Sequence, residues 1–296
     1  MGGWDFARRG GLDARPRRSR QGRGAGLAGA RRGAVVYRMT YRTALITGAS
    51  SGIGRGLARA LAESGTQVIA CARRGGELEA LIAEINAQSG WGRARALVLD
   101  VADSEATRAA VKQADADVGG LDLVVANAGV GAPPGVPTWS WEALGAACQI
   151  NFVGAAATLT AALPQMVARR RGHLVGMSSL ASFGALPGAS AYCAPKAGLS
   201  MLLDCLRLDL RNTGVAVTAI HVGFVRTPML DHAQHALPQL LPVDVAVAAM
   251  LARLPARPAE INLPQPLALG TRLFAGLPRG LRDLLFRLPL FRRDGI

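Results

Sequence analysis

The chain has 296 residues, half of them hydrophobic, which is long and apolar enough for one domain with a large core. Its formal net charge is +14, of which residues 1–38 contribute +8 and residues 253–296 contribute +5. The stretch between them is almost neutral, so the folded core offers no obvious face for nucleic acid. No run of 18 or more apolar residues occurs, which argues against a helix that spans a membrane. No C-x-x-C pair occurs either, which argues against a zinc site or a disulfide framework and favours a cytoplasmic protein with reduced thiols.

Residues 1–38 are rich in Gly, Ala and Arg and lack any periodicity, which predicts a disordered extension. Arg8 and Arg9 resemble a twin-arginine signal, but no apolar stretch follows them. An Arg-rich, acid-poor segment is also compatible with an organelle transit peptide. We favour a third interpretation, in which translation starts at Met39, just before the first predicted strand.

Between residues 39 and 270, short apolar runs alternate with helical patterns. We expect strands at 43–47, 67–71, 96–100, 121–127, 172–178, 215–222 and 260–263. We expect helices at 52–64, 76–88, 141–171, 191–212 and 244–254, with Pro164 marking a break or kink in the third. This alternation predicts an α/β fold, a Rossmann-like doubly wound parallel sheet of about seven strands with helices on both faces.

A glycine-rich turn, T-G-A-S-S-G-I-G at residues 47–54, separates the first predicted strand from the first helix. Backbone N–H groups at such a helix N-terminus, together with the helix dipole, bind a pyrophosphate well. Gly48, Gly52 and Gly54 would give the turn geometry, the close approach of the backbone and the tight helix packing. A glycine pattern alone could be an ordinary loop, but here the strand and helix that the motif requires flank it.

The end of the second predicted strand indicates which nucleotide binds. It reads C-A-R-R at residues 71–74, without the carboxylate that would bond the adenosine ribose and repel a 2′-phosphate. Arg73 and Arg74 can pair with that phosphate, which predicts NADP(H) rather than NAD(H). The alternative is that both arginines are solvated loop charges.

A second motif combines a hydroxyl, a phenol and an ammonium. Tyr192 and Lys196 are four residues apart at the start of a predicted helix, so they share one helical face. We expect the nearby ammonium to lower the pKa of the phenol, so that Tyr192 can act as a general acid or base near neutral pH. Ser179 follows the fifth strand and could stabilise charge on a substrate oxygen. Each residue taken alone has an ordinary structural explanation, so the prediction of an active site rests on the three residues together.

In their order and spacing, these motifs resemble those of the short-chain dehydrogenase/reductase family over about residues 40–265. The resemblance implies an NAD(P)-dependent oxidoreductase that acts on CH-OH and C=O groups. In a reduction, hydride would come from NADPH and the proton from Tyr192, while Ser179 orients the substrate oxygen. Lys196 would bind the nicotinamide ribose, and Asn151 would hold a water on a proton relay.

The resemblance also implies a set of cofactor contacts. Asp100 would contact the adenine, and Asn127 would stabilise the sheet within A-N-A-G, which replaces the family's N-N-A-G. The residues expected to bind the cofactor are Gly48, Ser50, Ser51, Gly52, Ile53, Gly54, Arg73, Arg74, Asp100, Val101, Asn127, Ala128, Gly129, Tyr192, Lys196, Val222, Gly223, Val225 and Thr227.

The chain departs from the family pattern at two positions near the site. Pro195 replaces the usual Ser of Y-x-A-S-K and is expected to place the helix start near Ala194. Val222 replaces the Pro of the usual Pro-Gly pair, which is expected to loosen the loop that leads to Thr227.

The predicted substrate loops are apolar and rich in proline, which favours a hydrophobic aldehyde, ketone or lipid-like carbonyl. They comprise residues 130–138, residues 184–188 and the segment after Thr227. Their apolar side chains are Val136, Trp139, Leu186, Pro187, Met229, Leu230 and Leu237. The histidines His221, His232 and His235 form no evident metal-binding set, so no metal is expected.

Residues 271–296 form a basic amphipathic segment. Leucines recur at helical spacing, at Leu273, Leu277, Leu281, Leu284 and Leu288. Other positions are taken by Arg279, Arg282, Asp283 and Arg287, and Pro278 and Pro289 limit the helix length. Such a segment could lie on an anionic membrane, cover a partner subunit or cover the protein's own core, and we favour the last two.

The resemblance implies a homodimer or homotetramer formed through the helices that carry Asn151 and Tyr192. Two other functions are compatible with parts of the sequence. One is a non-enzymatic NADP(H)-binding regulator or scaffold on the same fold, and the other is a nucleic-acid binder that uses the N-terminal arginines. The complete set of Ser179, Tyr192, Lys196 and Asn151 favours the enzyme.

Overall fold

The computed structural model describes residues 41–88, 90, 93–131, 133, 135–230 and 238–287. The predictions for residues 1–38, Met39, His232, His235, Leu237, Leu288 and Pro289 lie outside these ranges.

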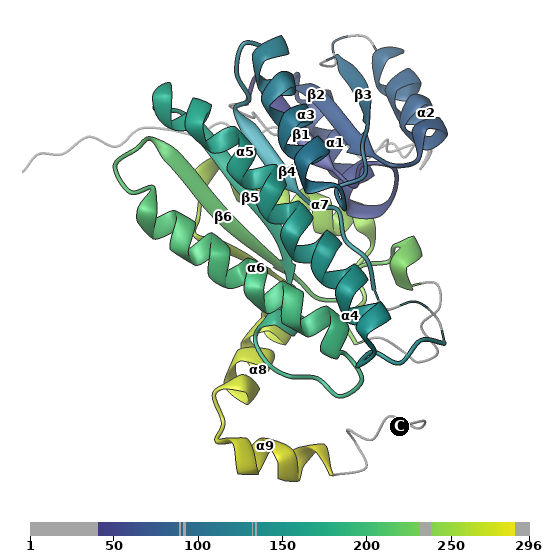
Figure 1. Cartoon of the computed structure of the whole chain (residues 1–296), viewed down its shortest axis with the longest axis vertical. Helices are drawn as coiled ribbons and strands as arrows, with labels where there is room; N and C mark the ends of the chain where they lie inside the picture. The colour runs from purple at the N-terminus through teal and green to yellow at the C-terminus, as the bar shows by residue number, and fades with distance from the viewer. Residues whose placement is uncertain are drawn as a thin grey trace, which may run out of the picture. The chain divides into compact units, whose positions relative to one another are not determined.

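A seven-stranded parallel sheet forms the centre of the fold (Figure 1). Its strands are β1 (Thr43–Thr47), β2 (Gln67–Ala72), β3 (Ala94–Val98), β4 (Leu123–Ala126), β5 (Gly172–Ser179), β6 (Val215–Val222) and β7 (Glu260–Leu263). Their order is β3-β2-β1-β4-β5-β6-β7, and every neighbouring pair is parallel. The strand order reverses between β1 and β4, so a ligand crevice is expected at the carboxyl ends of these strands. The predicted doubly wound fold is confirmed.

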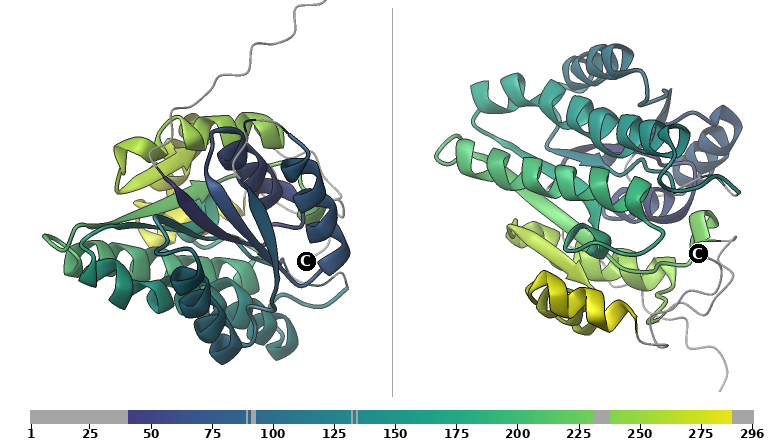
Figure 2. Two further views of the ribbon diagram at one scale, coloured as in Figure 1. Left: turned by 90° about the horizontal axis from the view of Figure 1, so that it is seen from above. Right: turned by 60° about the horizontal axis from the view of Figure 1, so that its bottom comes forward.

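Helices cover both faces of the sheet, as the views in Figure 2 show. They are α1 (Gly52–Glu63), α2 (Gly75–Asn86), α3 (Ser104–Asp117), α4 (Trp141–Cys148), α5 (Ala155–Ala168), α6 (Ser190–Asp209), α7 (Val243–Leu251), α8 (Gln265–Ala275) and α9 (Arg279–Phe286). One core cluster joins the sheet to α1, α2 and α7, and another joins it to α3, α5 and α6. Successive side chains of β1 point to opposite faces of the sheet, so Ala44 and Ile46 belong to the first cluster and Leu45 to the second.

Two elements differ from the sequence-based expectation. β3 begins and ends two residues earlier than expected. α3 was not expected at all, because its 14 residues are largely polar; Asp103 caps it by accepting a hydrogen bond from the backbone N–H of Ala106.

The single helix expected over residues 141–171 is interrupted, but not at Pro164, which lies inside α5. The interruption is a π-helical segment, Gln149–Gly154, between α4 and α5. There the chain runs so close to the end of β3 that a Cβ at Gly154 would lie 2.5 Å from the carbonyl oxygen of Val101. Residues 141–168 are long and apolar enough to cross a membrane by length and composition alone, but half of the qualifying window is buried in the fold, as in an ordinary core helix.

The C-terminal segment contains two helices, α8 and α9. α8 packs on the sheet end, where Arg272 forms a two-pronged ion pair with Glu260 of β7 and lies over the ring of Phe183. α9 is joined to α8 by an edge-on contact between Phe274 and Phe286, with ring centroids 5.1 Å apart. The start of the basic segment, at Arg272, therefore lies against β7 and Phe183.

Candidate active site

The glycine turn follows β1 with the tight geometry that the motif predicts. Gly48 has a φ of +68°, and a Cβ there would lie 2.8 Å from the Cα of Ala128. A Cβ at Gly54 would collide with the carbonyl oxygen of Gly48. A side chain at either position would push the turn away from β4, so glycine is required at both.

Asn127 fastens the end of β4 to the glycine turn. Its Nδ2 donates to the carbonyl oxygen of Thr47 at 2.9 Å. The Thr47 hydroxyl accepts from the backbone N–H groups of Asn127 and Ala128, at 3.0 and 3.1 Å. These contacts give Asn127 the sheet-stabilising position that the family resemblance implies.

The two arginines after β2 have different partners. Arg74 donates to the hydroxyls of Ser50 and Ser51 in the glycine turn, at 2.8 and 2.9 Å. Arg73 lies 3.7 Å from the Asp100 carboxylate that follows β3. Of the two arginines that could pair with the phosphate, Arg74 is therefore the one that faces the turn.

The loop after β6 closes over the same turn. A Cβ at Gly52 would lie 2.9 Å from Cγ2 of Thr227. The N–H of Gly223 donates to the carbonyl of Leu263 at 2.7 Å, and Val225 forms a bridge with Leu241. These two backbone contacts support the loop at Gly223 and Val225.

Ser179 lies at the carboxyl end of β5, beside Val222 of β6. Its hydroxyl donates to the carbonyl of Val222 at 3.2 Å and accepts from the N–H of Ala181 at 3.1 Å. It also forms a side-chain hydrogen bond with the phenol of Tyr192. The expected serine and tyrosine are thus in contact.

Helix α6 carries Tyr192 and Lys196, and it begins at Ser190, one residue before the expected range 191–212 and four before the start near Ala194 that Pro195 suggested. Pro195 consequently lies inside the helix. The catalytic spacing is unaffected, because both residues remain in the first two turns.

Lys196 is almost fully buried, with an exposed fraction of 4%. Its Nζ donates to the carbonyl of Met177 at 2.8 Å and lies 5.8 Å from the centroid of the Tyr192 ring. Burial lowers the pKa of Lys196 to about 8. At neutral pH the ammonium is still charged, but it loses its proton more readily than a surface lysine.

The pKa of Tyr192 moves in the direction opposite to our expectation. Burial raises it above its usual value, and the hydrogen bond with Ser179 only partly offsets this effect. In the protein alone, the phenol therefore keeps its proton across the neutral range, which suits a proton donor.

Asn151 lies in the π-helical segment and is fully buried. Its Oδ1 accepts from the N–H of Val130 at 2.8 Å and its Nδ2 donates to the carbonyl of Val130 at 2.9 Å. A Cβ on Gly129 would lie 3.0 Å from Oδ1 of Asn151 and 3.5 Å from Nζ of Lys196. Asn151 and Lys196 thus both approach Gly129, and the Asn151 side chain fixes the backbone that follows β4.

A further polar chain, which sequence reasoning missed, lies behind Lys196. Ser178 and Ser200 both donate to the carbonyl oxygen of Lys196, at 3.1 and 3.0 Å, and their hydroxyls are 2.7 Å apart. Ser200 also contacts Nε2 of His221 at 3.1 Å, and Nδ1 of His221 lies 4.0 Å from Glu260. One signal was present in the sequence, since Ser200 is one helical turn after Lys196.

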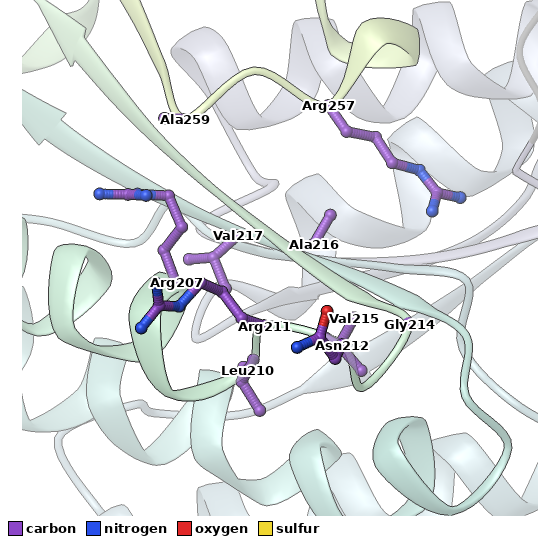
Figure 3. A pocket seen from close by; sticks show the side chains of 10 residues that line it. All are labelled: Arg207, Leu210, Arg211, Asn212, Gly214, Val215, Ala216, Val217, Arg257 and Ala259. Carbon is purple, nitrogen blue, oxygen red and sulfur yellow. The ribbon is translucent and has the colours of Figure 1, made fainter.

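The apolar residues expected around the substrate flank this site but are mostly open to solvent. Trp139 is 80% exposed, and Leu186, Pro187 and Met229 are also exposed. A separate hollow, shown in Figure 3, lies between the end of α6 and the start of β6, at the opposite edge of the sheet from Ser179. It contains none of the predicted site residues. Among the described residues, no group of three His, Cys, Asp or Glu side chains could hold a metal ion.

Comparison with known proteins agrees with this geometry. Residues 42–237 match the family model described as short chain dehydrogenase. An uncharacterized oxidoreductase of Myxococcus xanthus is 47% identical over 226 residues, which cover 76% of this chain and 88% of the relative.

Solved structures resemble the fold as well. A short-chain dehydrogenase from Sphingobium yanoikuyae in complex with NADPH has a TM-score of 0.71 at 27% identity, covering 86% of this chain and 98% of that one. A 3-oxoacyl-[acyl-carrier protein] reductase from Brucella melitensis with bound NAD has a TM-score of 0.64 at 28% identity, covering 75% and 89%.

Proposed function

The chain belongs to the short-chain dehydrogenase/reductase family, and we propose that it is an NADP(H)-dependent oxidoreductase that interconverts a carbonyl and an alcohol. The observation that carries this proposal is the contact between Ser179 and Tyr192, with Lys196 buried beside them. All three lie at the carboxyl edge of the sheet, which also carries the glycine turn.

The bound nicotinamide would supply the hydride, and the protein's own side chains would handle the proton. Tyr192, which burial keeps protonated, would donate to the carbonyl oxygen of the substrate. Ser179 would turn its hydroxyl from Val222 toward that oxygen and stabilise the developing charge. Lys196 would hold the nicotinamide ribose and favour the phenolate once the proton has left.

We infer a preference for NADP(H) from the positive charge at the end of β2. Arg74 contacts Ser50 and Ser51 of the glycine turn, so its guanidinium would be available to a phosphate on an adenosine ribose bound at that turn. The solved relatives include one with NADPH and one with NAD, so the residues of this chain must carry the argument.

We infer a hydrophobic carbonyl as the substrate. Trp139, Leu186 and Met229 follow three different strands and stand exposed around the catalytic edge. Closure of these side chains over a ligand would bury apolar surface, which favours an apolar substrate over a highly polar one.

The test is NADPH oxidation with aldehydes and ketones of graded chain length, with wild type and Tyr192→Phe. We expect the substitution to lower kcat about 100-fold or more, because it removes the proton donor, while NADPH binding is retained. Tyr41→Phe is the matched control, since Tyr41 is a buried tyrosine whose hydroxyl bonds His173 and Leu254.

Two results would contradict the proposal. Full activity of Tyr192→Phe would exclude the assigned proton donor. NADPH binding without turnover of any compound in the panel would favour the non-enzymatic regulator.

We also propose that the protein is a homodimer or homotetramer assembled through α5 and α6. Met201 and Leu208 are exposed apolar residues on α6, at 65% and 46%. Light scattering on the purified protein decides this, and a monomer at micromolar concentration would contradict it.

A further inference from the structure

Helix α9 carries an apolar face that the described part of the chain does not cover. Leu281 and Leu284 lie on one side of the helix and are 43% and 57% exposed. Phe286, which attaches α9 to α8, lies on the other side. The leucines therefore point away from the protein body, and Figure 1 shows α8 and α9 extending beyond the ends of the strands.

The same arrangement continues on α8. Leu269 and Leu273 are one helical turn apart and are 62% and 65% exposed. α8 adjoins the candidate substrate loop, because a Cβ on Gly184 would lie 3.2 Å from the Cβ of Ala275. The exposed leucines are thus attached directly to the rim of the candidate active site.

Two exposed tryptophans also lie beyond the carboxyl edge of the sheet. Trp139 and Trp141 follow β4 and are 80% and 81% exposed. Indole rings with one apolar and one polar side favour the boundary between a membrane and water.

The charges on α9 indicate what kind of surface it meets. Residues 279–287 contain three arginines and one aspartate. Arg279 is exposed on the side opposite the leucines, and Arg287 is exposed one turn after Leu284, at the edge of the apolar face. A helix with leucines on one face and arginines behind and beside that face binds at the surface of an anionic bilayer, where the leucines enter the headgroup region and the arginines meet lipid phosphates.

We propose that α8 and α9, together with Trp139 and Trp141, dock the protein on an anionic phospholipid bilayer. The carboxyl edge of the sheet then faces the lipid, so that an apolar carbonyl compound dissolved in the membrane could reach Tyr192 without crossing water. A second copy of this chain is a less favourable occupant of the surface than an anionic bilayer, because its α9 carries the same net positive charge. The docking itself does not depend on the proposed reaction.

The experiment is flotation of the full-length protein with vesicles of phosphatidylcholine alone or with 30% phosphatidylglycerol. We expect binding to the anionic vesicles and a loss of about tenfold or more for the double variant Leu281→Gln/Leu284→Gln. The variant Arg279→Gln/Arg287→Gln should lose about 25-fold in binding to the anionic vesicles, at roughly fivefold per arginine.

The matched control is Val98→Gln/Val245→Gln, which alters two exposed valines on β3 and α7. It should bind as wild type does. Thermal unfolding of each variant verifies that it is folded, and none of the substituted residues belongs to the catalytic set, so vesicle binding and turnover are separate readouts.

Three outcomes would overturn the proposal. Unchanged flotation of the leucine variant would exclude α9 from the docking surface. Absence of wild-type binding to anionic vesicles would exclude bilayer docking. A change in oligomeric state without a change in vesicle binding would assign the surface to a second copy of the chain.

Discussion

The hydroxyl of Ser200 lies 3.1 Å from Nε2 of His221, which links α6 to β6 one helical turn from Lys196. Ser200 also donates to the carbonyl of Lys196, and Ser178 of β5 does the same. The backbone that carries the buried ammonium is therefore held from two strands at once. We infer that Ser200 is a positioning residue for Lys196.

Ser200→Ala should lower kcat about tenfold, with little change in the KM for NADPH, because the substitution loosens Lys196 rather than removing a cofactor contact. The alkaline limb of the pH profile of kcat should move to higher pH, because water that reaches the Lys196 ammonium raises its pKa back toward the ordinary value. Ser64→Ala removes a comparable serine–carbonyl bond at the end of α1 and serves as the control. An unchanged pH profile would reduce Ser200 to a structural role.

Lys196→Met should make the cofactor-free protein more stable while abolishing turnover. At pH 7 the fold holds a buried charge, and its removal should raise the free energy of unfolding by on the order of 2 kcal/mol. The unfolded chain keeps this proton up to pH 10.5 and the folded chain only up to about 8, so the advantage of the variant should shrink as pH rises from 8 to 10.5. Denaturant titration checks this against Lys112→Met, which alters an exposed lysine; equal effects of the two substitutions would contradict it.

Arg74→Ala should raise the KM for NADPH about tenfold or more and leave that for NADH nearly unchanged, because a charge-assisted bond to the 2′-phosphate is lost. Arg73→Asp should reduce the preference for NADPH less, since Arg73 is turned toward Asp100. Steady-state kinetics with both nucleotides decide the matter, and Arg59→Ala on α1 is the control. If neither variant alters the preference, the arginines are solvated loop charges.

His173 should make the protein less stable in acid. Its ring lies between the hydroxyls of Tyr41 and Thr218, at 2.6 and 2.8 Å, and burial lowers its pKa from 6.5 to about 3. Between these values the unfolded chain binds a proton that the folded chain does not, so stability falls as pH falls below 6.5. Relative to its value at pH 7.5, the free energy of unfolding at pH 5 should fall by about 2 kcal/mol more in wild type than in His173→Gln.

The hydrogen bonds around His173 show what a result that contradicts this prediction would mean. A neutral ring can donate a hydrogen bond from only one of its two nitrogens. The hydroxyls of Tyr41 and Thr218 also donate to the backbone carbonyls of Leu254 and Pro258. If the wild-type protein instead gained stability in acid relative to the variant, the folded ring would carry a proton and donate from both nitrogens.

The layout of the sheet could be predicted from the sequence because buried parallel strands read as short apolar runs. β1, β6 and β7 have the expected bounds. α3 could not be predicted in this way, since its hydrophobic stripe consists of little more than Val111 and Ala114. The position of β3 depends on its pairing with β2, where Val68 is opposite Ala94, and no local pattern encodes that pairing.

The candidate site was predictable as a set of residues, and the structure adds what each one touches. The spacing of Tyr192 and Lys196 placed them on one helical face, but it could not show that burial would outweigh the ammonium in setting the pKa of the phenol. The partner of Arg74 and the link from Ser200 to His221 join residues more than 20 positions apart, so they arise only from the fold.

The π-helical segment Gln149–Gly154 makes the chain unusually sensitive to its length at one place. Before it, Ala143 and Ala147 of α4 pack on Ala191 of α6, and within it, Asn151 bonds Val130. If the same residues were rewound as ordinary α-helix, one side of the segment would rotate relative to the other by about 100°. Only one of the two contacts could then survive, so engineered chimeras that exchange α4 or α5 should keep this segment and its number of residues intact.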